Sequence, residues 1–261
     1  MADARRMAAL VVACVLSCAP AIAQEALKSQ MDVPKPLEKS DAPNAFRVLF
    51  IGDSITLHGT SAKLAAKLGW DHVAGMAASG EARDYAHVFS GLLQGALPDR
   101  SVELYFHTYG GSGTVAQRLS AIDVVRPVEP HLVVIQLGEH EKDRSGLDKL
   151  RADLAALVTT FNAQNPPPSV ICAGPWSPPP ASGKSSYDGW AGEVETAMRE
   201  VCAQKNIPFI SVRNLAEDPA CSGWGKSDGV KWHPNDKGHE GYARKYFTAW
   251  QLHQANIIND K

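Results

Sequence analysis

The stretch FRVLFIGDSIT, residues 46–56, decides the fold, because an apolar run ends there in a glycine, an acid and a serine. A short and nearly continuous apolar run is typical of a strand that is buried on both faces of a parallel sheet. The polar residues Gly52-Asp53-Ser54 follow at the carboxyl end of that strand, where open parallel sheets bind their ligands. The serine is therefore either part of a turn that caps a helix or a group that reacts.

Four more segments have the same strand-like pattern, namely residues 101–109, 131–138, 169–176 and 208–212. Apolar residues at helical spacing lie between and after them, at residues 81–97, 114–125, 147–162, 187–205 and 234–255. Alternating strands and helices predict a three-layer α/β/α sandwich around a central, mostly parallel five-stranded sheet. We expect one domain over residues 45–261, with a proline-rich loop at residues 176–184 that overhangs one edge of the sheet.

The first residues of the chain are typical of a targeting segment rather than of the fold. Residues 1–23 contain two arginines, an apolar run and the small residues Ala21-Ile22-Ala23, which is the layout of a secretory signal. We expect cleavage after Ala23 and export to the periplasm or the extracellular space, with a lipoprotein signal at Cys18 as the alternative. The apolar run is too short to span a bilayer stably. Residues 24–44, rich in proline and charge, predict a flexible leader.

Composition excludes some classes of partner. The 261 residues are 44% hydrophobic and 21% charged, and the net charge is -2, so no basic field attracts nucleic acid or anionic lipid. Three cysteines remain after cleavage, Cys172, Cys202 and Cys221. The sequence allows one disulfide with one buried thiol, or Cys172 and Cys202 as small hydrophobic residues of the core. No Cys/His spacing resembles a metal site, and we expect neither a metal nor another cofactor. The oligomeric state stays open.

Polar and glycine residues follow the first three predicted strands and precede the last helix. Gly113 lies in GGSGT after the second strand, and His140 lies in GEHE after the third. Asp228 and His233 lie in SDGVKWHPNDKGH near the C-terminus. Because the carboxyl ends of parallel strands meet at one edge of a sheet, we expect these segments to converge on Ser54.

With these four blocks in this order, the chain resembles the GDSL or SGNH hydrolases over about residues 46–250. GDSIT resembles the nucleophile block, YGGSGT the glycine block, QLGEHE the Gly-x-Asn-Asp block and DGVKWHPNDKGH the closing Asp-x-x-His block. The resemblance implies the flavodoxin-like SGNH hydrolase fold and cleavage of carboxylic esters by a serine. The chain departs from the family pattern twice. His140 stands where the family has asparagine, and Asp228 precedes His233 by five residues rather than three.

The resemblance assigns the proton-transfer roles. A serine hydroxyl needs a base within hydrogen-bond reach, and His233 can take the proton from Ser54 and return it. A carboxylate on the other ring nitrogen would fix the tautomer, and the resemblance points to Asp228, with a bulge at residues 231–232 absorbing the extra length. If Asp228 points away from the ring, Asp236 or a backbone carbonyl must take its place.

An ester hydrolase also needs hydrogen-bond donors for the developing oxyanion. The N–H of the nucleophile itself and that of Gly113 fit this role, and a ring N–H of His140 could replace the asparagine donor. We expect Glu139 or Glu141 to hold that ring. Asp53, next to the nucleophile, is a further candidate for the oxyanion and substrate site, although an acid at this point could equally cap a helix.

The predicted function is hydrolysis of a carboxylic ester on a small molecule or a polysaccharide. Exported members of the family frequently remove O-acetyl groups from polysaccharides, which makes a carbohydrate acetyl ester the first substrate hypothesis. Two alternatives stay open, an O-acyltransferase that uses the same serine and a non-catalytic carbohydrate-binding relic of the fold. Four tryptophans could line a pocket or pack in the core, Trp70, Trp176, Trp190 and Trp232.

Overall fold

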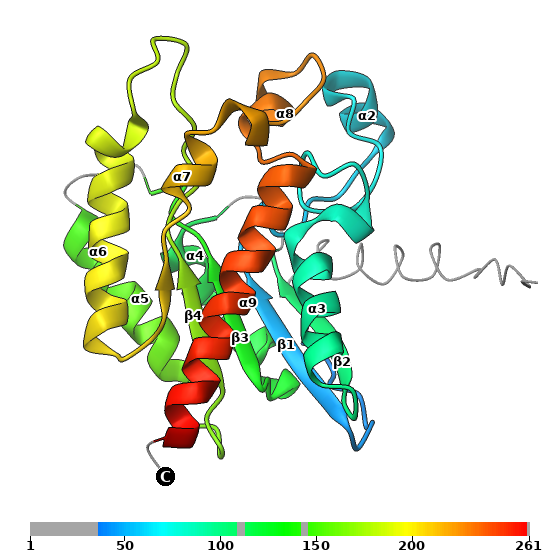
Figure 1. Cartoon of the computed structure of the whole chain (residues 1–261), viewed down its shortest axis with the longest axis vertical. Helices are drawn as coiled ribbons and strands as arrows, with labels where there is room; N and C mark the ends of the chain where they lie inside the picture. The colour runs from blue at the N-terminus through cyan, green and yellow to red at the C-terminus, as the bar shows by residue number, and fades with distance from the viewer. Residues whose placement is uncertain (1–35, 109–112, 142–145, 260–261) are drawn as a thin grey trace, which may run out of the picture.

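The computed structural model describes residues 36–108, 113–141 and 146–259, with side chains up to residue 256 (Figure 1). The proposed signal peptide, residues 1–23, lies outside the described residues, as does most of the leader. Five parallel strands form one central sheet in the order β2-β1-β3-β4-β5. The strands are β1 (Ala45–Ile51), β2 (Ser101–His107), β3 (Leu132–Gln136), β4 (Ser169–Ala173) and β5 (Phe209–Ile210).

Helices cover both faces of this sheet, as the sequence predicts (Figure 1). One face packs against α3 (Tyr85–Ala96) and α9 (Asp236–Asn259). The other packs against α4 (Val115–Ser120), α5 (Leu147–Phe161) and α6 (Trp190–Gln204). The five predicted helices and the three-layer sandwich are confirmed. The helix predicted at residues 114–125 is shorter than expected, because it ends at Ser120, and the one predicted from residue 81 begins at Tyr85.

The sequence pattern missed the shorter helices, which carry too few residues to show a period. They are α2 (Ala62–Leu68), α7 (Arg213–Ala216) and α8 (Asp228–Trp232). Single 3₁₀ turns complete the connections, at Glu81–Arg83, Ile122–Val124, Arg126–Val128, Ser186–Asp188 and Pro219–Cys221.

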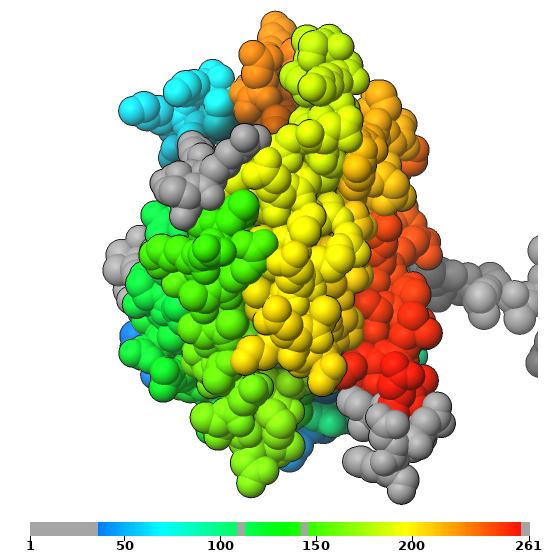
Figure 2. All heavy atoms as spheres, turned by 90° about the vertical axis from the view of Figure 1, so that its left-hand side faces the viewer, coloured from blue at the N-terminus to red at the C-terminus, as the bar shows by residue number. Residues whose placement is uncertain are grey.

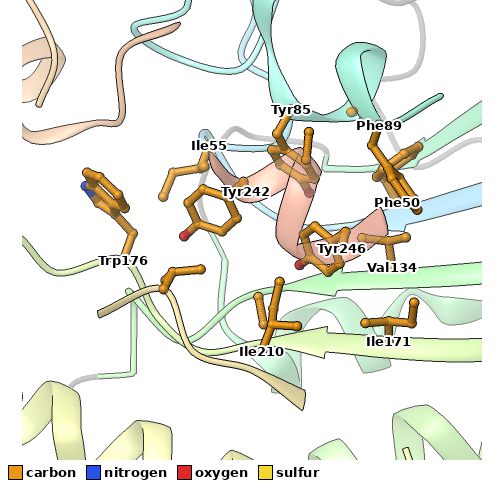
Figure 3. Packing of buried hydrophobic residues seen from close by; sticks show 14 of the residues in the cluster. Phe50, Ile55, Tyr85, Phe89, Val134, Ile171, Trp176, Ile210, Tyr242 and Tyr246 are labelled. Atoms are coloured by element: carbon orange, nitrogen blue, oxygen red, sulfur yellow. The ribbon is translucent and has the colours of Figure 1, made fainter. Parts of the chain in front are cut away.

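The sequence of the central strand β1 is apolar without a break because the strand is buried on both faces. Phe50 packs with the rings of α3 and α9, among them Tyr85 and Tyr246 (Figure 3). Its neighbours Leu49 and Ile51 point to the opposite face and pack against α4, α5 and α6. All three side chains are fully buried, so this strand is held rigidly up to the residue where its polar turn begins.

The end of the leader is docked rather than free. The backbone N–H of Leu37 donates to the carbonyl of Val124, at 2.8 Å, and the Ser40 hydroxyl donates to Glu103. The prediction of a flexible leader is therefore wrong for residues 36–44, because polar groups near the N-terminal ends of the strands pair with it. The three cysteines Cys172, Cys202 and Cys221 are free, buried thiols.

The loops at the carboxyl ends of the strands stand together at one end of the molecule (Figures 1 and 2). The segment that follows β4, residues 174–185, projects beyond the body of the protein at this end. Within the described residues, no helix is both long and apolar enough to cross a membrane. The same part of the chain contains no cluster of three or more metal-ligating side chains.

Candidate active site

The strand order places a topological switch point between β1 and β3. The chain leaves β1 toward β2 on one side and leaves β3 toward β4 on the other, so the two connections diverge at this point of the sheet. Such a switch point is where open parallel sheets bind ligands. Ser54 follows β1 and His140 follows β3, which puts both predicted residues at this switch point.

The nucleophile candidate lies in a single tight turn and not at the start of a helix. The carbonyl of Asp53 accepts from the N–H groups of Thr56 and Leu57, at 3.0 Å each, and the chain then runs on as a loop. A side chain at Gly52 would place its Cβ 1.9 Å from Oγ1 of Thr56, so this turn requires glycine. The helix-capping alternative for Asp53 and Ser54 is therefore wrong.

Ser54 and His233 meet across 179 residues of sequence. The hydroxyl Oγ of Ser54 lies 2.8 Å from Nε2 of His233, and both residues are buried. The other ring nitrogen, Nδ1, lies 2.5 Å from the carbonyl oxygen of Gly229. A carbonyl can only accept, so Nδ1 carries the proton and Nε2 accepts from the serine. This is the tautomer that a general base on Ser54 requires.

Burial sets the protonation state of this histidine. Desolvation lowers the pKa of His233 to about 4, opposed in part by its hydrogen bond to the Gly229 carbonyl. The positive partial charges of neighbouring histidines also disfavour the imidazolium. The ring is therefore neutral at pH 7 and able to accept a proton.

The predicted role of Asp228 on His233 is not met by the geometry. The carboxylate of Asp228 is fully exposed, and it forms an ion pair with Lys231 on the solvent side, at 3.9 Å. The reason is local: residues 228–232 form the short helix α8 instead of a bulge, so Asp228 starts a helical turn and points outward. Asp236 does not replace it, because its carboxylate binds the backbone and hydroxyl of Ser79.

The helix α8 presents a backbone carbonyl where the carboxylate was expected. The last four carbonyls of a helix have no partner within it. The amide of His233 bonds to Val230 instead of Gly229, which leaves the Gly229 carbonyl for the imidazole ring. The other end carbonyls bind elsewhere: Gly223 N–H donates to Lys231, and the indole of Trp176 donates to Trp232 at 2.6 Å. These contacts fix the orientation of the ring.

Two backbone amides beside Ser54 are available for an oxyanion. Within the described residues, the N–H groups of Ser54 and Gly113 donate no hydrogen bond. Gly113 is buried against Arg118, whose guanidinium nitrogen would lie 2.7 Å from a Cβ at this position. Arg118 in turn donates from Nε to the Gly52 carbonyl, at 2.8 Å, and so joins the glycine block to the nucleophile turn. The glycine block residues 109–112 lie outside the described residues.

His140 faces the acid that precedes the nucleophile. Its Nε2 lies 3.6 Å from Oδ2 of Asp53, and one third of its side chain is exposed. The prediction that Glu139 or Glu141 holds this ring is wrong, since Glu141 accepts from the Val115 amide and Glu139 points inward to Asp53. The acid that orients His140 is therefore Asp53.

Several polar residues support the site in ways that the sequence did not assign to them. Arg118, Gln136 and Glu139 lie behind the nucleophile turn, and His239 of α9 bridges Met76 to Tyr85. The Met76 amide donates to the Ser54 carbonyl at 2.8 Å, so this bridge holds the loop that supports the serine. The sequence pattern places Gln136 in an apolar strand and His239 in a helix, and it does not indicate a hydrogen-bond partner for either residue.

Comparison with known proteins supports the chemistry that this geometry indicates. A model of the GDSL-like lipase/acylhydrolase family matches residues 50–240. The chain belongs to this family. The protein is therefore a carboxylic ester hydrolase of the GDSL/SGNH type. No curated protein matches the chain in sequence.

Solved structures share the fold of this GDSL-family protein at low sequence identity. The psychrotrophic esterase EstA from Pseudoalteromonas sp. is 16% identical, with a TM-score of 0.54, covering 80% of this chain and 99% of its own. An acetylxylan esterase from Geobacillus stearothermophilus, Axe2, is 19% identical with a TM-score of 0.56, covering 82% and 95%. TesA is 21% identical with a TM-score of 0.51, covering 78% and 97%.

Proposed function

We propose that the protein removes short acyl groups, acetyl first, from carbohydrate esters outside the cytoplasm, through a Ser54–His233 dyad. The contact that carries the proposal is the 2.8 Å approach of Oγ of Ser54 to Nε2 of His233. A buried serine next to a neutral imidazole, at the switch point of a parallel sheet, is what nucleophilic catalysis on an ester requires.

In the first half of the reaction Ser54 attacks the ester carbonyl. Its proton passes to Nε2 of His233, and the imidazolium that forms keeps its Nδ1–H on the carbonyl of Gly229. A carbonyl dipole stabilises this cation less than a full carboxylate would. The lowered pKa of the ring keeps it in the proton-accepting form down to about pH 4.

The oxyanion of the tetrahedral intermediate binds the amides of Ser54 and Gly113, with a ring N–H of His140 as a third donor. The intermediate collapses when His233 gives its proton to the leaving alcohol. A water molecule, deprotonated by the same imidazole, then hydrolyses the acyl–serine ester and restores the hydroxyl of Ser54.

A small hollow next to the dyad supports a short acyl group or a sugar ring as the bound part. Its volume is about 150 Å³, and its walls include Trp176, Trp190 and Trp232 beside Gly138. Trp232 also stands edge-on to the ring of His233, with ring centres 5.1 Å apart, so this residue is shared between the hollow and the surroundings of the base. Pockets for drug-sized ligands measure about 300–1,000 Å³, so this hollow favours a small group.

The choice of a carbohydrate ester rests on two further observations. Aromatic walls offer flat apolar surfaces to the C–H faces of a sugar. One structural neighbour is an acetylxylan esterase, although at 19% identity this likeness shows only the fold. Export is proposed from residues 1–23, whose basic residues, apolar run and small residues before Gln24 form a secretory signal.

The test combines covalent labelling with hydrolysis of acetyl esters. We expect a fluorophosphonate to label the protein on Ser54, and the Ser54→Ala variant to lose both labelling and p-nitrophenyl acetate hydrolysis. Acetate release from acetylated xylo-oligosaccharide should exceed release of hexanoate from the matching hexanoyl ester. A wild-type protein that is folded but neither labelled nor active would overturn the dyad. Activity that rises with acyl length would overturn the short-acyl preference, and acyl transfer to added oligosaccharide in excess of hydrolysis would replace hydrolase by transferase.

A further inference from the structure

Two carboxyl groups lie together under the nucleophile turn, and each has one oxygen without a donor. Asp53 is buried, Glu139 is half-buried with a buried Oε2 atom, and the two carboxyl groups are adjacent. In the part of the chain that the structure describes, Oδ2 of Asp53 and Oε2 of Glu139 have no hydrogen-bond partner. Two ionised carboxylates are both acceptors only, and burying such a pair without a proton is strongly unfavourable.

The remaining oxygen of Glu139 is already saturated by donors. A chain of hydrogen bonds runs from the Tyr85 hydroxyl to Oγ1 of Thr56 and on to Oε1 of Gln136. The Gln136 amide then donates to Oε1 of Glu139 at 2.6 Å, and the Trp176 backbone N–H donates to the same oxygen at 2.6 Å. Oε1 of Glu139 is thus the acceptor oxygen, and Oε2 is where a proton would reside.

Asp53 shows the complementary pattern. Its Oδ1 accepts from the Ile55 amide at 2.9 Å, and its buried Oδ2 lies 3.6 Å from the Nε2 of His140. The carboxyl group of Glu139 is its other neighbour. One hydrogen atom between the two orphaned oxygens would therefore give each of them a partner.

We propose that Glu139 is protonated at neutral pH, that its Oε2–H donates to Oδ2 of Asp53, and that the one negative charge left on the pair orients His140 for the oxyanion. The pair acts through His140 and the turn of Ser54, so both acids are positioning residues. The part that concerns the oxyanion rests on the proposed ester hydrolysis.

The electrostatic surroundings agree with this assignment. Burial raises the pKa of Glu139 well above its ordinary value, and the adjacent charge of Asp53 raises it further. The pKa of Asp53 is also raised by burial, but amide donation from Ile55, the charges of His140 and Arg118, and the hydrogen bond to Glu139 all lower it. The other titratable groups that face the pair are tyrosines whose burial keeps them neutral, Tyr85, Tyr187, Tyr242 and Tyr246.

Loss of the shared proton would place two carboxylates in contact under the catalytic turn. Their repulsion separates the β1 turn from the β3 turn, which moves the amide of Ser54 away from the ring of His140. Activity should then fall as the pH rises through the ionisation of the pair. The free energy of unfolding should fall at lower pH, from about 4.5 up to the ionisation of the pair, because over that range the folded protein holds a proton that the unfolded chain has released.

The decisive experiment measures the proton directly in the free protein. Infrared spectra at pH 7 are expected to show the carbonyl stretch of a buried protonated carboxylic acid in the wild type and not in Glu139→Gln. The glutamine amide can donate to Asp53 permanently, so this variant keeps the contact and should fold. The matched control Glu141→Gln removes a carboxylate from the same loop and should retain the band. A wild-type spectrum without the band would overturn the shared proton, whether or not the protein hydrolyses esters.

Two pH profiles test the consequence. In Glu139→Gln the fall of kcat/KM at alkaline pH is expected to move up by at least about one pH unit, because no proton is lost from an amide. The unfolding midpoint of this variant should also depend less steeply on pH between 5 and 8 than that of the wild type. Wild-type-like profiles in both measurements would overturn the positioning role. A wild-type protein that shows the infrared band but hydrolyses no ester would contradict the proposed function and leave the shared proton intact.

Discussion

Substitution of Asp228 distinguishes between two arrangements of the site: a Ser–His dyad held by a backbone carbonyl, and a triad that includes a carboxylate. In serine hydrolases whose carboxylate holds the histidine, its substitution lowers kcat by about 10⁴. In this protein the Asp228 carboxylate is fully exposed and faces Lys231, and the Nδ1 of His233 is already bonded to Gly229. We therefore expect Asp228→Asn and Asp228→Ala to change kcat/KM by less than about threefold, as for other surface substitutions.

The assay is hydrolysis of p-nitrophenyl acetate at pH 7, with the thermal unfolding midpoint of each variant as a check on folding. His233→Ala is the reference variant, and we expect it to lose about 10⁵-fold or more in kcat, since it removes the base itself. Lys231→Ala is the matched surface control, because it removes the other partner of the exposed pair. A loss above about 100-fold in a folded Asp228→Asn protein, which exceeds any surface effect, would refute the dyad.

Three further outcomes follow from the site. Because burial lowers the pKa of His233 to about 4 and catalysis needs its neutral form, kcat/KM should halve near pH 4, and a midpoint near 6.5 would contradict the burial argument. His140→Ala should lose about 10²- to 10³-fold in kcat and His140→Asn much less, as amide N–H can still donate; equal rates in both would remove His140 from the oxyanion site. Trp176→Phe should cost at least about 1 kcal/mol of stability, measured by urea unfolding, because it leaves the buried Trp232 carbonyl without its 2.6 Å donor; unchanged stability would show that this carbonyl is not essential to α8.

The sequence alone determined the layers of the fold and the two reacting groups. Residues 46–51 must form a buried strand because nearly every side chain is apolar, and the switch to Gly52-Asp53-Ser54 marks its carboxyl end. The motif around His233 then indicates the base, and parallel topology brings the two together at 2.8 Å. These features depend on hydrophobic period and on strand direction, which are local properties of the chain.

Only the tertiary structure decided what holds the base and what lies beneath the nucleophile. Whether residues 228–232 form a bulge or a helix depends on hydrogen-bond donors from Gly223 and Trp176. Trp176 is distant in the sequence, and no motif marks Gly223. The meeting of Asp53 with Glu139 likewise requires the neighbouring β1 and β3 in their observed register. Burial and hydrogen-bond partners are properties of the packed chain, and they, rather than the residue type, set the protonation state of each of these groups.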